Sequence, residues 1–274
     1  MKINKKILNT GAWSLAVLVL IVSLGFAGKE QSSRKCLGIR IRVADQTGNL
    51  FIEPKDIMEV LNTRGTKVKG SQMEDINIPL LEKIVYSNPF VEKAEVYSTI
   101  DGYVNIDAWQ RNPAFRVVNI DNEHFYVDEK GAFMPVTDKY TSPVIVASGF
   151  IFDDYAEKNL NYAVPNTRDS LAKPVLVQIN EIANFIRSNE FWDAQIEQIY
   201  VNEKYEIELV PRVGNHTILL GNSENLEEKM ENLMIFYKEA TNKTGWEKYS
   251  MINLKFKDQV VGTIRNYQTT QKTN

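Results

Sequence analysis

Hydrophobic and polar positions divide the chain into one uniformly apolar stretch and a long mixed remainder. Residues 8–27 read LNTGAWSLAVLVLIVSLGFA and contain no charged side chain. A helix of about 20 residues is roughly 30 Å long, which matches the hydrocarbon core of a bilayer. Such a helix satisfies its own backbone hydrogen bonds in lipid. The pattern therefore predicts a transmembrane helix at residues 8–27 that carries one large globular portion.

The charges before this stretch favour one orientation. Lys2, Lys5 and Lys6 lie in residues 1–7, and positive residues tend to stay on the cytoplasmic side. The alternative is a cleaved signal peptide, because Gly25-Phe26-Ala27 offers small residues where a signal peptidase reads them. The apolar stretch is longer than a typical signal core, which favours retention. Both interpretations place residues 30–274 outside the cytoplasm.

Alternating and helical patterns predict a first domain at residues 37–112. Apolar and polar residues alternate over 37–43, which indicates a strand with one buried face. Two short helices follow, the first beginning near Pro54 and the second covering residues 79–86. Asp101-Gly102 then predicts a tight turn between two further strands. The expected order is strand, helix, helix, strand, strand.

A second domain, with a mixed sheet and flanking helices, is predicted at residues 113–266. Helices are expected at 171–189, with Pro174 in the first turn, and at 223–240, with Ser223 as the cap. The expected strands cover residues 115–120, 124–127, 132–135, 144–147, 196–201, 205–210, 216–220, 249–256 and 260–264. Residues 267–274 form a polar tail that is predicted to be disordered. The chain as a whole is predicted to be an α+β protein.

Composition gives no support for catalysis. The formal net charge of −3 gives no reason to expect a nucleic-acid partner. Cys36 is the only cysteine, and the two histidines, His124 and His216, lie in strand-like contexts. Zinc-ligand spacings, phosphate-binding loops and nucleophile motifs do not occur. We therefore predict no catalytic residue, no cofactor, no metal site and no small-molecule substrate.

One stretch carries a family resemblance. Residues 78–96, IPLLEKIVYSNPFVEKAEV, resemble the second half of a POTRA domain, in which a helix ends at Asn-Pro and a strand and hairpin follow. The return strand at 103–109, followed by Gln110-Arg111-Asn112-Pro113, resembles the end of that domain. Gln110 stands where the family usually has glutamate. The resemblance implies a POTRA domain with the order β-α-α-β-β.

The colinear order of motifs resembles the bacterial cell-division family FtsQ/DivIB. After the single span and the POTRA unit come Asn112-Pro113-Ala114, then YVDEKG at residues 126–131, and a late INLKF strand at 252–256. Asn253 and Lys255 replace the usual aspartate and arginine. The resemblance implies a POTRA domain and an FtsQ-type β domain on a single-pass protein. That protein would be a non-enzymatic scaffold of the cytoplasmic (inner) membrane at the division septum.

The resemblance also implies partners and a site. Members of the family are expected to bind FtsB/FtsL-type bitopic proteins and to help regulate septal peptidoglycan synthesis, and strand addition to an open sheet edge is a physical route. Phe256 stands where a tyrosine is common and is the expected anchor, unless its ring packs on its own sheet. An edge of the POTRA domain is a second route by which other septal proteins would bind. The predicted partner-binding residues are Leu254, Lys255, Phe256, Lys257, Asp258, Val260 and Val261.

Two other functional classes remain open from the sequence. One is a POTRA-containing component of envelope assembly or secretion. The other is an anchored envelope enzyme of unknown chemistry, which the missing catalytic residues disfavour.

Overall fold

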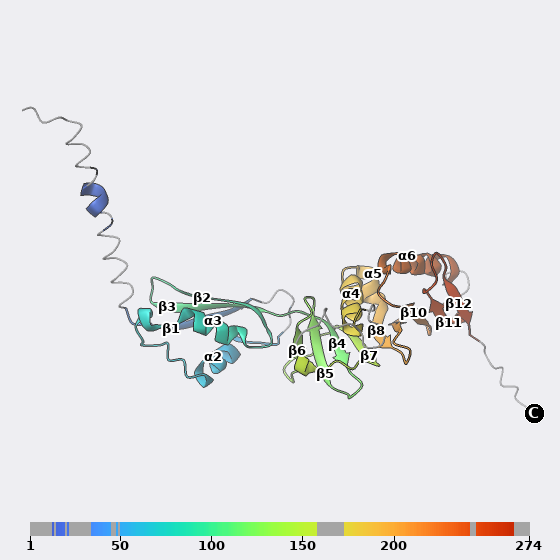
Figure 1. Ribbon diagram of the computed structural model, residues 1–274, viewed down its shortest axis with the longest axis horizontal. Helices are drawn as coiled ribbons and strands as arrows, with labels where there is room; N and C mark the ends of the chain where they lie inside the picture. Colours follow the sequence, from blue (N-terminus) through green and yellow to red (C-terminus); the bar gives the residue numbers. More distant parts are fainter. Residues whose placement is uncertain are drawn as a thin grey trace, which may run out of the picture. The chain divides into compact units, whose positions relative to one another are not determined.

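The computed structural model describes residues 34–44, 48, 50–157, 173–241 and 245–265, together with 13, 15–19 and 21 (Figure 1). The chain divides into two compact units, residues 1–111 and 112–274.

The predicted membrane helix falls largely outside the described residues. Those that are described, Trp13, residues 15–19 and Ile21, are helical and expose their side chains. Within the described part of the chain, no helix combines the length and the apolar character needed to span a bilayer. The predicted tails at residues 1–7 and 267–274 also lie outside the described residues.

Unit 1 is a three-stranded sheet with two α-helices on one face. Its elements are β1 (Gly38–Ala44), α2 (Pro54–Thr63), a 3-10 turn (Met73–Asp75), α3 (Ile78–Tyr86), β2 (Val91–Ser98) and β3 (Tyr103–Gln110). The strand order is β1-β3-β2, with β1 parallel to β3 and β2 antiparallel to it. The predicted β-α-α-β-β order is confirmed.

Local signals fix the helices of unit 1. Glu53 and Asp56 form a reciprocal capping box at the start of α2, where Pro54 occupies the first turn. The Asn77 side chain accepts a hydrogen bond from the Leu80 amide and caps α3. The alternate apolar residues of the strands meet the helices in one buried core, made by Cys36, Ile52, Ile57, Leu61, Val68, Leu81, Ile84, Val85, Val91, Ala94, Val96, Val104, Ile106 and Ala108.

Unit 2 is a nine-stranded mixed sheet in the order β12-β11-β10-β9-β8-β7-β4-β5-β6. The pairs β4–β7, β7–β8 and β10–β11 are parallel, and the other pairs are antiparallel. The strands are β4 (Pro113–Val118), β5 (His124–Asp128), β6 (Phe133–Pro135), β7 (Ile145–Gly149), β8 (Ile196–Val201), β9 (Ile207–Pro211), β10 (Thr217–Gly221), β11 (Tyr249–Asn253) and β12 (Val261–Ile264).

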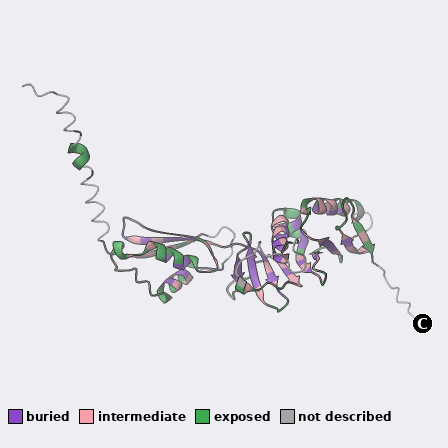
Figure 2. Ribbon diagram, in the orientation of Figure 1, coloured by how far each residue is buried: buried purple, intermediate pink, exposed green. Residues whose placement is uncertain are grey.

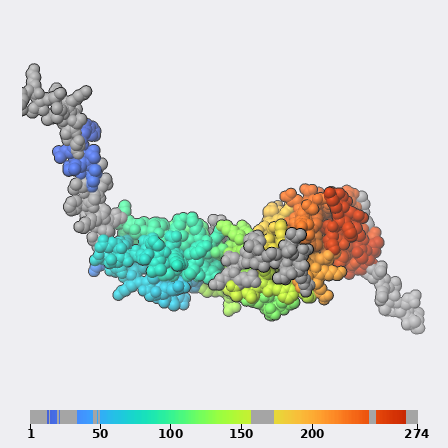
Figure 3. Space-filling view, in the orientation of Figure 1, coloured from blue at the N-terminus to red at the C-terminus, as the bar shows by residue number. Residues whose placement is uncertain are grey.

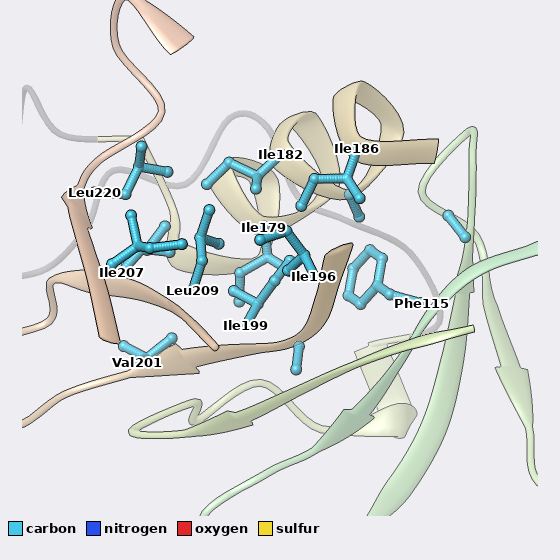
Figure 4. Close-up of a cluster of buried hydrophobic side chains, with 14 of the residues drawn as sticks. Phe115, Ile179, Ile182, Ile186, Ile196, Ile199, Val201, Ile207, Leu209 and Leu220 are labelled. Carbon is cyan, nitrogen blue, oxygen red and sulfur yellow. The ribbon is translucent and has the colours of Figure 1, made fainter. Parts of the chain in front are cut away.

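Three helices cover one face of this sheet: α4 (Val175–Arg187), α5 (Glu190–Gln195) and α6 (Leu226–Phe236), which continues as a π-helical turn at Tyr237–Thr241. Short 3-10 turns lie at Tyr155–Glu157 and Trp246–Lys248. Figure 4 shows the core between α4 and the strands, where Ile179, Ile182 and Ile186 meet Ile199 and Leu209. These five side chains are at most 1% exposed. The central strands are largely buried, whereas three of the four residues of β12 are exposed (Figure 2).

The predicted helix starts in unit 2 were wrong in two places. Pro174 caps α4 from outside rather than occupying its first turn. Ser223 does not cap α6, which begins after Asn225, a residue in left-handed backbone conformation. The Ser223 hydroxyl instead donates to Glu181 at 2.6 Å. The prediction also missed α5, whose first amides are capped by the Asn189 side chain.

A candidate partner-binding surface

The last strand of the chain lies at the edge of the nine-stranded sheet. β12 pairs with β11 in antiparallel register, Asn253 opposite Val261 and Ile252 opposite Gly262. Within the described ranges, no strand pairs with the other side of β12. An edge strand presents unpaired backbone amides and carbonyls, which can accept another chain.

The hydrogen bonds identify which residues of β12 face the open side. The Arg265 amide donates to the Lys248 carbonyl at 2.9 Å, and the Thr263 carbonyl accepts from the Ser250 hydroxyl at 3.3 Å. Thr263 and Arg265 therefore direct their backbone groups toward β11. Because these directions alternate along an antiparallel strand, Gly262 and Ile264 direct theirs to the open edge.

One face of β12 is closed by aromatic rings. A Cβ atom on Gly262 would lie 2.7 Å from ring atoms of Tyr249 and 3.3 Å from Cζ of Phe236. The rings of Phe236 and Tyr249 meet edge to face, with centroids 5.1 Å apart. This packing fixes β12 against α6. The Ile264 side chain is left 58% exposed beside the open edge.

The predicted strand 249–256 is confirmed over Tyr249–Asn253, but its last three residues were wrong, because the chain leaves the sheet after Asn253 and turns. The Leu254 amide donates to the Leu219 carbonyl at 2.9 Å, and the Asn253 side chain accepts from the Lys255 amide at 3.0 Å. The side-chain bond replaces a ladder bond and starts the turn. Asp258 then adopts a positive φ of 56° and returns the chain toward β12.

A groove of about 100 Å³ lies between this turn and the first half of α6. The segments that line the groove, together with β12, are coloured orange to red in Figure 3. The lining residues of the groove are Asn225, Glu228, Lys229, Asn232, Leu254, Lys255, Phe256, Lys257, Gln259 and Val260.

Lys229 fixes the helix side of the groove. Its Nζ donates to the Leu220 carbonyl at 3.1 Å and to the carbonyl and side-chain oxygens of Asn222 at 2.9 Å each. Burial lowers the pKa of the Lys229 ammonium. These hydrogen bonds connect α6 to the end of β10. Lys229 therefore positions the helix side of the groove and does not offer its charge to a partner.

Lys255 fixes the turn side of the groove. Its Nζ pairs with the Glu206 carboxylate, and its aliphatic stem lies on Gly221, where a Cβ would approach Cγ of Lys255 to 2.8 Å. The hydrogen bond from Lys255 holds the pKa of Glu206 below its usual range. Lys255, like Lys229, acts as a positioning residue.

The structure places the seven predicted site residues in different roles. Leu254 is only 3% exposed and belongs to the core, and Val260 packs against that core. Phe256 is 54% exposed at the groove, with its neighbour Lys257 also exposed. Lys255 holds the turn, as described above, Asp258 shapes it, and Val261 begins β12.

The C-terminal end of β12 is fixed by a polar cluster. The Arg265 guanidinium donates to the Asn215 carbonyl, and the Asn215 amide donates to Glu247 at 3.0 Å. Next to them His216, which is 4% exposed, hydrogen-bonds through Nε2 to the Tyr237 hydroxyl at 2.9 Å. Burial lowers the pKa of His216, with the nearby Arg265 charge adding to the effect.

Among the residues that the structure describes, no group of three or more His, Cys, Asp or Glu side chains could hold a metal ion. His124 contacts the Arg116 guanidinium at 2.9 Å on the sheet, and Cys36 is a buried core residue of unit 1.

The sequence interpretation missed the α6 side of the groove and the outermost residue of β12. Asn225, Glu228 and Asn232 follow the spacing of one helical face, so the sequence contains a signal for a polar stripe. That signal does not say which segment lies opposite. Ile264 belongs to the predicted strand 260–264 but was not included in the site.

Comparisons with known proteins match both units. A family model described as FtsQ/DivIB, C-terminal related, matches residues 112–263. A POTRA-like domain model matches residues 34–109. A search of curated proteins gave no match. The first of these matches contains the groove and most of β12.

Proposed function

Because the chain belongs to the FtsQ/DivIB, C-terminal related family, we propose that it is a non-enzymatic component of the cell-division machinery that captures a bitopic partner. Membership of this family suggests a role in the divisome, and both matched domain types are generally scaffold domains. The partner class that we propose is the FtsB/FtsL type, and the consequence of binding is regulation of septal peptidoglycan synthesis.

One observation carries this proposal: among the described residues, β12 is the outermost strand of the sheet and no strand pairs with its far side. Gly262 and Ile264 present backbone donors and acceptors to that edge, and an extended partner segment can pair with them as a tenth strand. Backbone hydrogen bonds of this kind supply affinity without requiring a particular partner sequence.

The groove beside the edge supports a role in specificity. Phe256 projects from the turn with 54% of its side chain exposed, and it is bordered by Lys257 and by the polar face of α6. An aromatic ring next to a groove is a common anchor of protein interfaces. The partner we propose places an apolar side chain on Phe256 and an acidic one near Lys257.

The membrane part of the proposal rests on the apolar stretch at residues 8–27. We propose a single span with a cytoplasmic N-terminus, which puts both units on the extracytoplasmic side at the septum. Such an anchor confines the protein to the same membrane as a bitopic partner.

The test is co-purification of the full chain with its FtsB/FtsL-type partners. Phe256→Ala should reduce the recovered partner several-fold while the melting temperature is unchanged, since the ring is exposed. Phe152→Ala is the matched control, because Phe152 is 57% exposed elsewhere on unit 2. Recovery at the wild-type level with Phe256→Ala would contradict the site, and a uniform membrane rim instead of a midcell band in imaging would contradict the divisome role.

A further inference from the structure

Two segments of unit 1 are basic and contain no acidic residue. Residues 34–43 contribute Arg34, Lys35, Arg40 and Arg42, and residues 64–72 contribute Arg64, Lys67 and Lys69. The chain as a whole has a net charge of −3, so these two basic segments differ from the rest of the protein.

The backbone brings the two segments together. The Cys36 amide donates to the Ser71 carbonyl and the Gly70 amide donates to the Cys36 carbonyl, each at 2.8 Å. Lys35 forms a β-bridge with Gln72. Cys36 is buried in the core, so this pairing is held rigidly. The basic side chains before and after it therefore gather at one end of unit 1.

Five of these seven basic residues have no ion-pair partner among the residues that the structure describes. Arg40 and Arg42 form ion pairs with Asp101 and Asp107, at 2.6 and 2.7 Å. The remaining five are exposed, and no ion pair joins any of them to a described residue: Arg34, Lys35, Arg64, Lys67 and Lys69. We call these five residues the basic end. The first acidic residues beyond them in sequence, Glu74 and Asp75, lie in the 3-10 turn that follows.

Apolar surface lies next to the basic end. Leu37 is 56% exposed and its amide bonds to the Gly102 carbonyl at 2.8 Å, which places it beside the β2–β3 turn. Ile100 in that turn is 74% exposed. A groove of about 600 Å³ also runs between β1 and the loop after α2, with an apolar lining that includes Ile39 and Met58 and with Lys67 and Lys69 at its border. Exposed apolar groups ringed by cations complement a lipid headgroup region.

The chain length ties this end of unit 1 to the membrane. The apolar stretch ends at Ala27, seven residues before Arg34. Seven residues span at most about 25 Å when fully extended, which is roughly three Debye lengths at physiological ionic strength. With the proposed anchor in the membrane, Arg34 cannot move farther than this from the lipid surface, and the rest of the basic end lies on the same folded unit.

We propose that the basic end docks on anionic lipid headgroups of the membrane that holds the anchor. Each lysine or arginine close to an anionic surface raises binding by roughly fivefold, so five of them act together even though each contact is weak. The tether removes most of the entropy cost of the encounter. Docking fixes the orientation of unit 1 on the membrane. The inference rests on the proposed anchor.

The test uses the full chain in nanodiscs, with a fluorophore on Gln72→Cys at the basic end. Cys36 is 2% exposed and stays unlabelled. The discs contain phosphatidylcholine alone or mixed with phosphatidylglycerol, and a nitroxide on the lipid headgroup quenches the dye at short range. We expect stronger quenching in the anionic discs, and we expect salt to remove the difference because it shortens the Debye length.

Charge-reversal variants distinguish binding by the basic end from an effect of the net charge of the whole protein. Lys67→Glu with Lys69→Glu should abolish the extra quenching, whereas the exposed pair Lys83→Glu with Lys204→Glu changes the net charge equally and should preserve it. Equal quenching in both lipids, or equal loss in both variants, would overturn the proposal. Quenching that depends on an added envelope protein and not on lipid charge would also overturn it, in favour of an acidic protein partner.

A failure of the anchor can be distinguished from a failure of the docking surface. A chain that does not enter nanodiscs contradicts the proposed anchor. The labelled chain is then mixed with vesicles of the same two compositions, and quenching that ignores lipid charge would overturn the docking proposal there as well.

Discussion

Substitution of Ile264 by proline tests the direction of the backbone groups in β12. The Ile264 amide points to the open edge, as the bond from the neighbouring Arg265 amide to Lys248 indicates. Proline lacks this N–H and is tolerated in edge strands when the missing group faces solvent. We therefore expect Ile264→Pro to leave unit 2 folded but to impair strand addition.

The size of the effect follows from one lost donor. A partner strand on β12 would form backbone hydrogen bonds with the amides and carbonyls of Gly262 and Ile264. Proline removes one of these donors, which leaves a partner carbonyl unpaired at a cost of about 1–3 kcal/mol. The dissociation constant should rise by roughly 5- to 150-fold. Ile264→Ala keeps the amide. It should lose about 1 kcal/mol of binding free energy at most, because the side chain is already 58% exposed in the free protein.

The assay is titration of the full chain in detergent with an FtsB/FtsL-type partner, accompanied by thermal melts of each variant. Thr263→Pro is the control with the opposite expectation. The Thr263 amide faces β11, so the loss of that amide should lower the melting temperature. Equal partner affinity for Ile264→Pro and Ile264→Ala would refute the edge geometry. A fall in stability for Ile264→Pro as large as that for Thr263→Pro would refute the assigned amide direction.

Three further predictions concern the turn, the buried histidine and the sheet. Phe256→Ala should cost about 2 kcal/mol of binding energy, as for a central aromatic anchor, with Phe152→Ala unchanged in the same titration; equal losses would exclude a specific anchor. Burial lowers the folded pKa of His216, so its contribution to stability is complete above about pH 6.5, the unfolded pKa, and is lost as the pH falls through the folded pKa. Melting temperatures of His216→Gln should fall less steeply below pH 6.5 than those of the wild type, and parallel curves would contradict this. Gly149→Ala would place a Cβ 2.2 Å from the Val201 carbonyl oxygen at a φ of +100°, so we expect about 3 kcal/mol of destabilisation in urea; an unchanged midpoint would count against it.

The elements of unit 1 were predictable because each carries its own local signal. Alternation defines β1, Asn88-Pro89 ends α3, and Asp101-Gly102 forms the tight turn between β2 and β3. These signals agree with one another, so the order β-α-α-β-β follows from the sequence.

The start of α6 was not predictable in the same way. Ser223 resembles a cap, but the chain adopts a left-handed conformation at Asn225 and starts the helix afterwards. Ser223 is instead recruited by Glu181, a residue 42 positions earlier. A tertiary hydrogen bond overrode the local capping preference, and local patterns contain no information about such a bond.

The candidate site was also only partly predictable, because local patterns contain no information about tertiary contacts. Ile252, Leu254 and Phe256 alternate as in a strand, yet the Asn253 side chain bonds to the Lys255 amide and turns the chain. Leu254 was predicted to bind the partner, but it is 3% exposed and belongs to the core, whereas Phe256 is 54% exposed. The other side of the groove is formed by residues at the start of α6, the last of which, Asn232, lies 22 residues before Leu254 in the sequence. The existence of the groove depends on sheet order, which the sequence pattern does not encode.

The most direct test of strand addition is amide hydrogen exchange in β12, measured on the full chain with and without its bitopic partner. We predict that the amides of Gly262 and Ile264 exchange freely in the unbound protein and become strongly protected in the complex. The amide of Thr263, which faces β11, should change far less. A stable complex in which Gly262 and Ile264 still exchange at their unbound rates would contradict the account.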